Sequence, residues 1–405
     1  MKVIYFLSEF PCYSETFIIN QINGLIERGI DIKIITLKQG EAKDIEIIKR
    51  HDLISRTTCL TDVSNGSISK RYGQLKNILF SLTNSNFRKI MIKKLKDKDF
   101  CFVNYANLIK KRSHFEADAI IAHFGPSAII ADDLIELGCL SGKLYPVFHG
   151  YDISQKTVLK KYLPAYQRLF KKDIIALPIS ELWRQKLLEF GCPAEKIIVN
   201  RMGIDADCFT FNPKVKLHSP LQLLTVARHS EKKGLEYAIQ AMKLLQAANI
   251  DFQYNIIGTG PLFDDHQQLI GELGLISSVT LLGYQDPNAI NQHLENTDVF
   301  ILPSVTAASG DMEGIPVALM EAMAKGVICL STLHSGIPEL IENNHSGYLV
   351  PERDPKALAT ILTEIVNGKH NLEQIKATAL QTILDMYNQK HIYDQLADLL
   401  RNNTK

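Results

Sequence analysis

The chain contains 405 residues, of which 46% are hydrophobic, and its 45 lysines and arginines nearly balance its 44 aspartates and glutamates. This length predicts two or three domains with real cores, and the composition excludes a disordered, fibrous or disulfide-stapled protein. The net charge of +1 indicates no particular partner. Seven cysteines without a C-x-x-C pair predict neither a disulfide framework nor a zinc ribbon, so the reducing cytoplasm fits best.

The hydrophobic runs of the chain are short. The N-terminal run turns polar at Ser8, which is too early for the core of a signal peptide. No stretch reaches the roughly 18 apolar residues that are needed to span a bilayer. We therefore expect a cytoplasmic protein whose only membrane contact is peripheral, on the inner face of the cytoplasmic membrane.

Apolar runs alternate with amphipathic stretches in the first half of the chain, which is typical of βαβ units and a parallel sheet. A helix over residues 15–28 is expected to stop at Gly29, and Ser180 is expected to cap a helix that ends at Phe190. The strands of this half are expected at residues 2–7, 31–36, 119–122, 144–148, 174–177 and 196–200.

The second half repeats this alternation, and the last stretch, 376–401, is helical in pattern. We expect two doubly wound Rossmann-like domains at residues 1–202 and 203–375, then a helical segment at 376–405 that packs back toward the first domain. Ligands bind beyond the carboxyl ends of parallel strands, so two facing domains would share one deep cleft. The strands are expected at 221–227, 252–257, 279–282, 299–302, 327–331 and 348–350. The helices are expected at 235–247, 264–273, 288–296, 316–325 and 356–367.

The strongest local signal is the segment 311–326, which reads DMEGIPVALMEAMAKG. It follows a predicted strand, so Glu313 stands in a loop at a strand end, and Pro316 starts a helix whose free N–H groups face the cleft. Glu321 lies inside that helix, where its carboxylate would accept hydrogen bonds from the vicinal hydroxyls of a ribose. Taken singly, either glutamate is more often a solvated side chain; their joint placement favours a binding site.

The E-x7-E spacing of Glu313 and Glu321, followed by Glu-Ala-Met-Ala-x-Gly, resembles the retaining family 4 glycosyltransferases of GT-B fold. It looks closest to the branch that builds colanic acid and other bacterial exopolysaccharides, and it is densest at residues 223–358. The resemblance implies an α/β protein of GT-B fold, with two doubly wound Rossmann-like domains that face an interdomain cleft. It also implies that Glu313 touches the donor sugar and Glu321 the ribose. The further donor-binding residues expected in this segment are Gly314, Ile315, Pro316 and Val317.

Residues 223–234 run from a predicted strand into a loop that carries Arg228 and Lys233. Two fixed cations beside a leaving nucleotide diphosphate would stabilise its developing charge without a metal, and the pair matches the family's R-x4-K-G motif. An exposed basic turn is the alternative. Gly258 and Gly260 follow another strand and would let the backbone approach the donor, although a lone G-x-G is usually just a tight turn.

Two histidines follow strands of the first domain. His149 stands in a His-Gly motif that resembles the family's, which implies a hydrogen bond to the donor sugar near the reacting carbon; the alternative is a histidine that orders its own loop. His123 is expected to contact the acceptor, or else to be structural. Together with Arg228, Lys233 and Glu313, His149 forms the expected catalytic set.

Ser14, Glu15 and Thr16 lie where the first loop meets a helix, whose N-terminus favours anions. Many members of the family have glycines here. Because this chain lacks them, we expect these three side chains to contact acceptor hydroxyls. Helix capping by Ser14 or Thr16 explains their presence about as well. Two D-x-D triplets, at 97–99 and 205–207, lie beside lysines and in the expected hinge respectively. We therefore expect no catalytic metal and no cofactor.

Together these features predict a retaining, metal-independent hexosyltransferase. Its donor would be a nucleotide diphosphate sugar, most simply a UDP-sugar, and its acceptor a glycan or lipid-linked oligosaccharide of bacterial polysaccharide synthesis. One alternative is a nucleotide-sugar epimerase on the same fold, and another is a non-catalytic sugar-nucleotide-binding subunit of a polysaccharide assembly complex.

The segment 70–112 carries twelve lysines and arginines against two aspartates. Apolar residues recur among these cations at helical spacing, which predicts an amphipathic surface that docks on an anionic membrane. A solvated helical face is the plainer alternative. A nucleic-acid partner lacks a supporting motif and is not expected.

Overall fold

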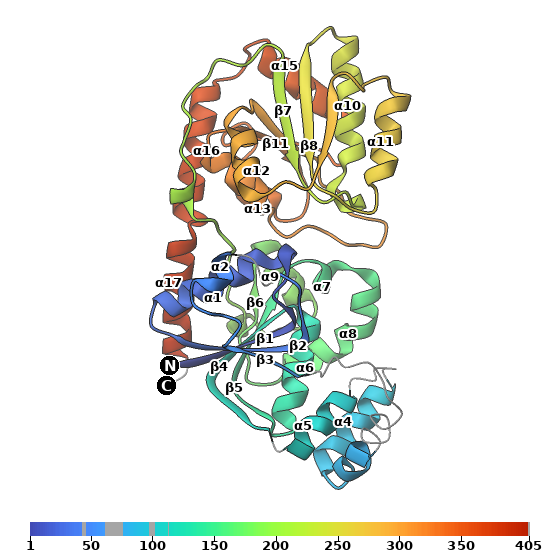
Figure 1. The fold of residues 1–405 in the computed structure, drawn as a ribbon. Coiled ribbons are helices and arrows are strands. Elements are labelled where there is room, and N and C mark those ends of the chain that lie inside the picture. The colour runs from blue at the N-terminus through green and yellow to red at the C-terminus, as the bar shows by residue number, and fades with distance from the viewer. Residues whose placement is uncertain (43–45, 61–75, 97–101, 112, 404–405) are drawn as a thin grey trace.

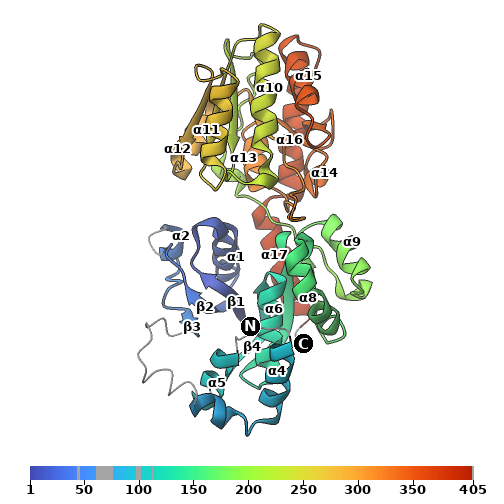
Figure 2. The ribbon, with the colours of Figure 1, turned by 90° about the vertical axis from the view of Figure 1, so that its right-hand side faces the viewer.

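The computed structural model describes residues 1–42, 46–60, 76–96, 102–111 and 113–403, which form two α/β domains stacked one above the other (Figure 1). Each domain contains a six-stranded parallel sheet with helices packed around it, and the N- and C-terminal ends of the chain lie near each other in both views (Figures 1 and 2). The predicted class, two doubly wound α/β domains, is confirmed.

The first sheet has the strand order β3-β2-β1-β4-β5-β6. Its strands are β1 (Lys2–Phe10), β2 (Asp31–Gln39), β3 (Thr57–Cys59), β4 (Phe115–His123), β5 (Leu140–Phe148) and β6 (Leu177–Pro178). Its helices are α1 (Thr16–Glu27), α2 (Glu46–Lys49), α4 (Ser85–Lys96), α5 (Phe102–Lys111), α6 (Gly125–Glu136), α7 (Tyr151–Ser154), α8 (Lys156–Leu169) and α9 (Glu181–Glu189).

The second sheet has the order β12-β11-β10-β7-β8-β9, which is the same topology as the first. Its strands are β7 (Leu221–Val226), β8 (Phe252–Ile257), β9 (Val279–Gly283), β10 (Val299–Leu302), β11 (Ile328–Thr332) and β12 (Tyr348–Val350). The helices of the second half are α10 (Leu235–Ala247), α11 (Phe263–Glu272), α12 (Pro287–Glu295), α13 (Val317–Ala324), α14 (Ile337–Leu340), α15 (Pro355–Val366), α16 (Leu372–Met386) and α17 (Gln389–Asn402).

Four sequence expectations need correction. The expected strand at 174–177 is reduced to β6 at Leu177–Pro178, because Ile174 and Ala176 form only isolated bridges. The expected strand at 196–200 is not a strand, because Ile197 joins the sheet only through one bridging pair with Ala176. The short edge strand β3 was not expected. The helical pattern at 376–401 is two helices, α16 and α17, because the chain leaves the helix at Tyr387 and Asn388.

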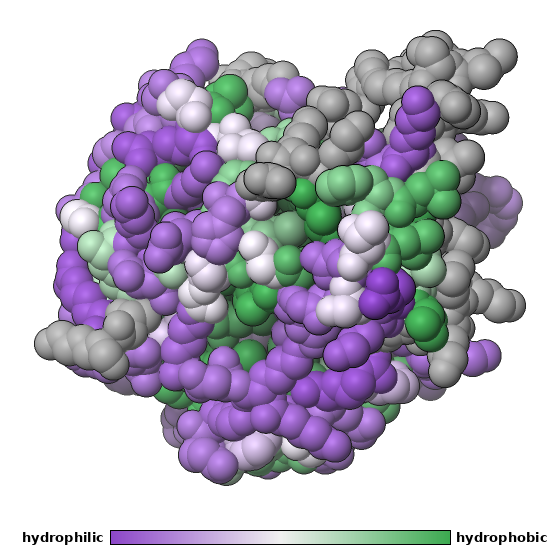
Figure 3. All heavy atoms as spheres, turned by 90° about the horizontal axis from the view of Figure 1, so that it is seen from below, coloured by the Kyte–Doolittle hydropathy of each residue, from purple (hydrophilic) through white to green (hydrophobic). Residues whose placement is uncertain are grey.

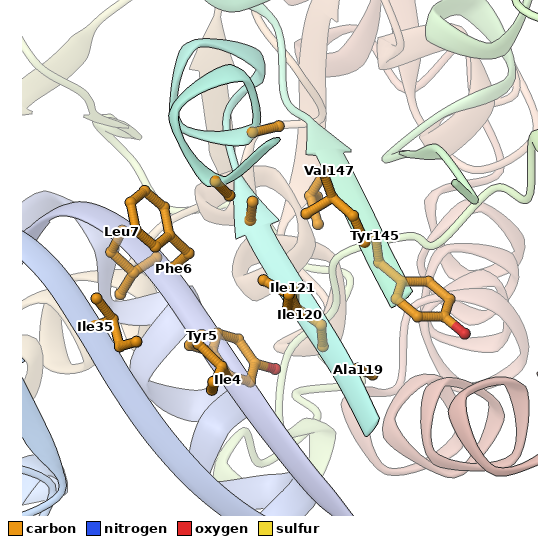
Figure 4. Close-up of a cluster of buried hydrophobic side chains, with 14 of the residues drawn as sticks. Ile4, Tyr5, Phe6, Leu7, Ile35, Ala119, Ile120, Ile121, Tyr145 and Val147 are labelled. Atoms are coloured by element: carbon orange, nitrogen blue, oxygen red, sulfur yellow. The ribbon is translucent and has the colours of Figure 1, made fainter. Parts of the chain in front are cut away.

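The central strands are buried on both faces, which explains their continuous apolar runs. Figure 4 shows Ile4, Phe6 and Leu7 of β1 beside Ile120 and Ile121 of β4 in the first core. Each such side chain stabilises the fold by about 1.5–3 kcal/mol when it leaves water. The positions that carry polar chemistry therefore begin where these strands end.

Ser180 caps helix α9 as expected, since its hydroxyl oxygen accepts a hydrogen bond of 3.2 Å from the Trp183 N–H. The chain crosses from one domain to the other twice, once near Ile204 and once near Tyr387, and the two crossings are neighbours. The Ile204 N–H donates to the Tyr387 carbonyl and the Gln389 N–H to the Ile204 carbonyl, both at 2.9 Å. This pairing holds the two crossings side by side.

Helices α16 and α17 contribute to different cores. Ile375 and Ile383 of α16 are buried in the second core, whereas Leu396 and Leu400 of α17 are buried in the first. On α17, Asp394 forms an ion pair of 2.7 Å with Arg28, at the end of α1. The last helix therefore ties the end of the chain to the first domain.

Loops of the second domain contact the first domain directly. The Lys156 N–H donates to the Ser309 carbonyl at 2.9 Å, and the Met312 N–H donates to the Ser154 hydroxyl at 3.1 Å. On another side, the Glu339 carboxylate of α14 accepts the N–H groups of Glu181 and Leu182, both at 2.9 Å. A carboxylate at the first turn of α9 is favoured by the unpaired N–H groups and by the helix dipole.

We expect Glu339→Ala to shift the protein toward a more open arrangement of its domains. Hydrogen bonds to a charged group contribute about 1.5–3 kcal/mol each, so the ratio of closed to open molecules should fall by roughly tenfold or more. Small-angle X-ray scattering should show a larger radius of gyration, while Glu342→Ala, a change at an exposed glutamate nearby, should leave it unchanged. An unaltered scattering profile in Glu339→Ala would contradict this role.

Candidate functional site

A cavity of about 980 Å³ lies between the two domains. Its volume is near the upper end of the range of about 300–1,000 Å³ that is usual for small-molecule sites. The first domain contributes residues of α1 and α2, including Thr16 and Phe17, and the second contributes Val317 and Glu321 of α13. The predicted donor and acceptor sides thus face one cavity.

Glu313 and Lys233 form the charged centre of the second domain's face. The Lys233 Nζ lies 2.9 Å from the Glu313 Oε1, and both side chains are largely buried. Burial alone would raise the pKa of the Glu313 carboxyl, but the neighbouring ammonium groups of Lys233 and Lys232 outweigh burial and hold it below its ordinary value. Glu313 is therefore a carboxylate at neutral pH, with a cation beside it.

His334 orients the loop that carries Glu313, and the sequence analysis did not identify it. Its Nε2 accepts the Glu313 N–H at 3.1 Å, which leaves Nδ1 to donate to the Glu352 carboxylate at 2.6 Å. Ser335 also donates to the Glu313 carbonyl at 2.6 Å. One feature of the sequence could have identified His334, namely its position shortly after β11 and directly before the Ser-Gly-Ile-Pro-Glu segment.

Gly314 brings this loop against the first domain. A Cβ atom at this position would lie 2.7 Å from the His149 carbonyl oxygen and 2.6 Å from the Ile179 Cδ1, which is too close for any side chain. The structure thus places the Glu313 loop directly beside the His-Gly segment. The Glu313 loop and the His-Gly segment, which are far apart in the sequence, are therefore in contact here.

His149 and His123 form a buried pair at the ends of β5 and β4. The His149 Nε2 lies 2.9 Å from the His123 Nδ1, and the His123 Nε2 lies 3.1 Å from the Gln21 Oε1. Burial lowers the pKa of His149 to about 3 and also lowers that of His123, so both rings are neutral. Since His123 is 1% exposed and uses both nitrogens inside the protein, these contacts favour the structural alternative over a contact with the acceptor.

Asp152 supports the His-Gly segment, and the sequence analysis assigned it no role. Its buried carboxylate accepts the N–H groups of Gly125, His149 and Gly150 at 2.8–3.1 Å. Burial raises the pKa of Asp152 to about 6, although these backbone hydrogen bonds act to lower it. One carboxyl therefore holds the loops after β4 and β5 together.

The loop after β7 carries Arg228, whose side chain is exposed. Gly258 and Gly260 pack on this loop, because a Cβ at either position would overlap a carbonyl oxygen, that of Ala227 or that of His229 respectively. This close packing by itself accounts for glycine at both positions. The glycines shape the donor side through the backbone that they support.

The remaining residues that were predicted to bind the donor divide between the cavity and the core. Val317 and Glu321 line the cavity, whereas Ile315 is 3% exposed and belongs to the second core. Pro316 is buried and immediately precedes α13. Burial raises the pKa of Glu321 to about 7.

The acceptor residues predicted in the first loop lie at the start of α1. Thr16 is the first residue of the helix and lines the cavity, while the preceding Glu15 makes no capping hydrogen bond with its side chain. Burial, followed by the repulsion of Glu9, raises the pKa of Glu15 to about 7. Ser14 lies in the short turn before it, and its side chain is outside the described residues.

The described residues contain neither a metal-binding cluster nor a membrane-spanning helix. Within the part of the chain that the structure describes, no group of three or more His, Cys, Asp or Glu side chains is placed to hold a metal ion. No helix of that part is long and apolar enough to cross a bilayer. Of the two D-x-D triplets, 97–99 lies outside the described residues, and Asp207 of the other pairs with Lys390.

Known proteins resemble this chain over both domains. A family model described as glycosyl transferases group 1 matches residues 209–403. The protein named as colanic acid biosynthesis glycosyltransferase WcaL, from Salmonella typhimurium, is 41% identical over 404 residues, which cover 99% of this chain and all of the relative. The chain belongs to the group 1 glycosyltransferase family. The amylovoran biosynthesis glycosyltransferase AmsK of Erwinia amylovora is 40% identical to this glycosyltransferase over 99% of both chains.

Solved structures share the architecture. Anabaena HepE in complex with UDP-glucose has a TM-score of 0.72 and 17% identity, covering 99% of this chain and 100% of that one. The lipopolysaccharide outer core galactosyltransferase WaaB, in its apo form, has a TM-score of 0.66 and 18% identity, with the same coverage. At such identities the likeness concerns the fold alone, and it confirms the predicted GT-B fold of the glycosyltransferase.

The raised pKa of Glu321 predicts how the stability of this glycosyltransferase depends on pH. The folded chain binds more protons than the unfolded chain between about pH 4.5 and pH 7, so stability falls as the pH rises through this window. The slope from this one group is at most about 1.4 kcal/mol per pH unit. We therefore expect Glu321→Gln to be more stable relative to wild type at pH 8 than at pH 5.

Thermal unfolding at both pH values measures this difference. Glu373→Gln, which changes an exposed glutamate on α16, is the matched control and should show no such pH dependence. If Glu321→Gln differs from wild type by the same amount at both pH values, the carboxyl does not carry the raised pKa.

Proposed function

We propose that this protein is a retaining glycosyltransferase that transfers a hexose-type sugar from a nucleotide diphosphate sugar to a growing bacterial exopolysaccharide. The observation that carries the proposal is the meeting of the Lys233–Glu313 pair with the His149 segment across the interdomain contact at Gly314. The names of the relatives WcaL and AmsK support exopolysaccharide synthesis, and the complex of HepE with UDP-glucose supports a UDP-sugar donor.

In this proposal the second domain holds the donor. Arg228 and Lys233 would stabilise the charge that develops on the leaving diphosphate, without a metal ion. Glu313 would bind the sugar hydroxyls and Glu321 the ribose, because a carboxylate accepts hydrogen bonds from paired hydroxyls. His149 would contact the donor sugar near the reacting carbon.

The first domain would hold the acceptor at the start of α1. Ser14, Glu15 and Thr16 are the proposed contacts, and of these Thr16 lines the cavity. Closure of the two domains would bring the acceptor hydroxyl and the donor phosphate together, so positioning and charge stabilisation would supply most of the rate.

The test is release of nucleoside diphosphate from a panel of nucleotide sugars, with and without a lipid-linked oligosaccharide acceptor. We expect turnover to persist in EDTA, and Arg228→Ala to lower kcat/KM by roughly ten- to a hundredfold. Arg168→Ala, which changes an exposed arginine on α8, should retain full activity. An absolute requirement for Mg²⁺ or Mn²⁺ would overturn the metal-free mechanism.

The same assay separates the two rival functions. Consumption of the nucleotide sugar without an acceptor, with a changed sugar as product, would favour an epimerase. Binding of nucleotide without any turnover would favour a non-catalytic subunit of a polysaccharide assembly complex. The largely buried ion pair of Lys233 and Glu313 argues against a site that has lost its catalytic residues.

We also propose that the segment 70–112 docks this cytoplasmic protein on the anionic inner face of the membrane. Residues 70–75, 97–101 and 112 of this segment lie outside the described residues. The described part lies at the end of the first domain that points away from the second domain, in both ribbon views (Figures 1 and 2). A molecule docked by this end would hold its cleft away from the bilayer, which suits a glycan that extends from its lipid.

Apolar and basic side chains share this end of the molecule. Figure 3 views it from below and shows green apolar patches among purple hydrophilic ones. Among the described side chains of this segment, the large apolar ones exposed by more than half are Leu79, Phe80 and Ile92. The exposed cations beside them in the sequence are Lys76, Arg88 and Lys89. Each cation near an anionic leaflet contributes about 1 kcal/mol to attachment.

We expect the wild-type protein to sediment with anionic but not with neutral liposomes, and high salt to release it. The double variant Arg88→Gln/Lys89→Gln and the double variant Leu79→Ser/Phe80→Ser should each weaken this binding severalfold. Ile276→Ser and Lys243→Gln change comparably exposed residues of the second domain and should bind as wild type does. If wild-type binding does not depend on lipid charge, this segment is not the anchor. The same conclusion follows if the two double variants bind as the wild type does.

A further inference from the structure

A row of buried polar side chains extends behind His149 into the core of the first domain. The Tyr5 hydroxyl on β1 lies 2.9 Å from the Gln21 Oε1 on α1, and the same oxygen lies 3.1 Å from the His123 Nε2. The His123 Nδ1 then lies 2.9 Å from the His149 Nε2. Figure 4 shows Tyr5 on β1 among the apolar side chains of this core.

The direction of every hydrogen bond in this row follows from the oxygen of Gln21. A carbonyl oxygen only accepts, so the Tyr5 hydroxyl and the His123 Nε2–H both donate to it. A neutral imidazole has a single N–H, so the His123 Nδ1 carries a lone pair and accepts from the His149 Nε2–H. The same rule leaves the His149 Nδ1 without a proton.

The burial of the row keeps both rings neutral. His123 and His149 are 1% and 8% exposed, and burial holds the pKa of each below its usual range. The His149 ring is also clamped between aromatic rings, with centroid distances of 5.1 Å to Phe17 and 4.5 Å to Phe124. These contacts restrict the orientation of the His149 ring.

The row ends at the cleft. His149 lines a small pocket together with Phe17 and Gly203, and these two residues also line the 980 Å³ cavity. Among the described residues the only side-chain hydrogen bond of His149 is made by its Nε2, so its Nδ1 is an unused acceptor at the edge of the site. An imidazole lone pair at such a place is complementary to a hydroxyl hydrogen.

We propose that Gln21 and His123 are positioning residues that fix His149 in the tautomer with an unprotonated Nδ1, so that His149 accepts a hydrogen bond from a donor-sugar hydroxyl. The assignment of the hydroxyl rests on the proposed function, which places His149 at the donor sugar. The tautomer itself depends only on the row. A sugar that lacks the hydroxyl, or carries an acceptor-only group in its place, would be selected against because the lone pair would then face no donor.

The experiment combines ¹⁵N NMR of the histidine rings with steady-state kinetics on the full chain. His149→Gln assigns the His149 resonances. In the wild type we expect a pyridine-type signal from the His149 Nδ1 and a pyrrole-type signal from its Nε2, unchanged over the neutral pH range. Gln21→Met removes the acceptor and should mix the two tautomers of His149, with a fall in kcat of roughly five- to tenfold and little change in the acceptor KM.

Two variants separate this role from simple packing. Gln21→Glu keeps an acceptor at the same place, so at a pH where the new carboxyl is ionised it should retain both the wild-type tautomer and most of the activity. Tyr5→Phe removes one donor to Gln21 but leaves the bond between Gln21 and His123, so it should preserve the His149 tautomer even where it lowers stability. Loss of the tautomer in Tyr5→Phe as severe as in Gln21→Met would overturn the proposal.

A pyrrole-type His149 Nδ1 in the wild type would overturn the proposal by itself, whatever the protein catalyses. So would an unchanged kcat in Gln21→Met with a mixed tautomer, because the tautomer would then not matter to the reaction. Failure of the proposed function has a different signature, namely a wild-type protein that shows the predicted tautomer and releases no nucleoside diphosphate from any donor.

Discussion

The close approach of the two domains at Gly314 determines how the other groups of the cleft are arranged. A side chain at this position would collide with the His149 carbonyl and with Ile179, so the loop after β10 could not reach the first domain. The contact places Glu313 beside the His-Gly segment, and two hydrogen bonds, from Lys156 to Ser309 and from Met312 to Ser154, tie the preceding part of the loop to the first domain. The cleft is therefore a joint product of two separately folded sheets.

Burial raises the pKa of each acidic group of the site, and the neighbours of each group decide whether that effect prevails. Glu313 stays ionised because Lys233 lies 2.9 Å from it, whereas Glu321 has no comparable cation among the causes of its shift and burial raises its pKa to about 7. Asp152 lies between these cases, since three backbone N–H groups offset part of the burial effect. A buried carboxylate thus takes its charge state from its neighbours and not from its residue type.

In the first domain, a group of buried polar side chains of the site is uncharged and is joined in a chain of hydrogen bonds. Gln21, His123 and His149 share hydrogen bonds without any charged member, which avoids the cost of burying an unpaired ion. The second domain instead uses His334 to join a backbone N–H to Glu352. In both domains, therefore, the residues at the strand ends are held by second residues that lie deeper in the protein.

The amino-acid sequence by itself determined the fold class, most strand and helix positions, the cap at Ser180 and the family. These features depend on local periodicity, on turn residues and on a motif whose members, Glu313 and Glu321, lie on one short segment. Only the tertiary structure decided that His123 is buried behind His149, that Ile315 belongs to the core, and that Gln21, Asp152 and His334 support the site. The physical reason is that each of these roles depends on contacts between chain segments that are far apart in sequence, such as Gln21 with His123 and His334 with Glu352, and local patterns carry no information about such contacts.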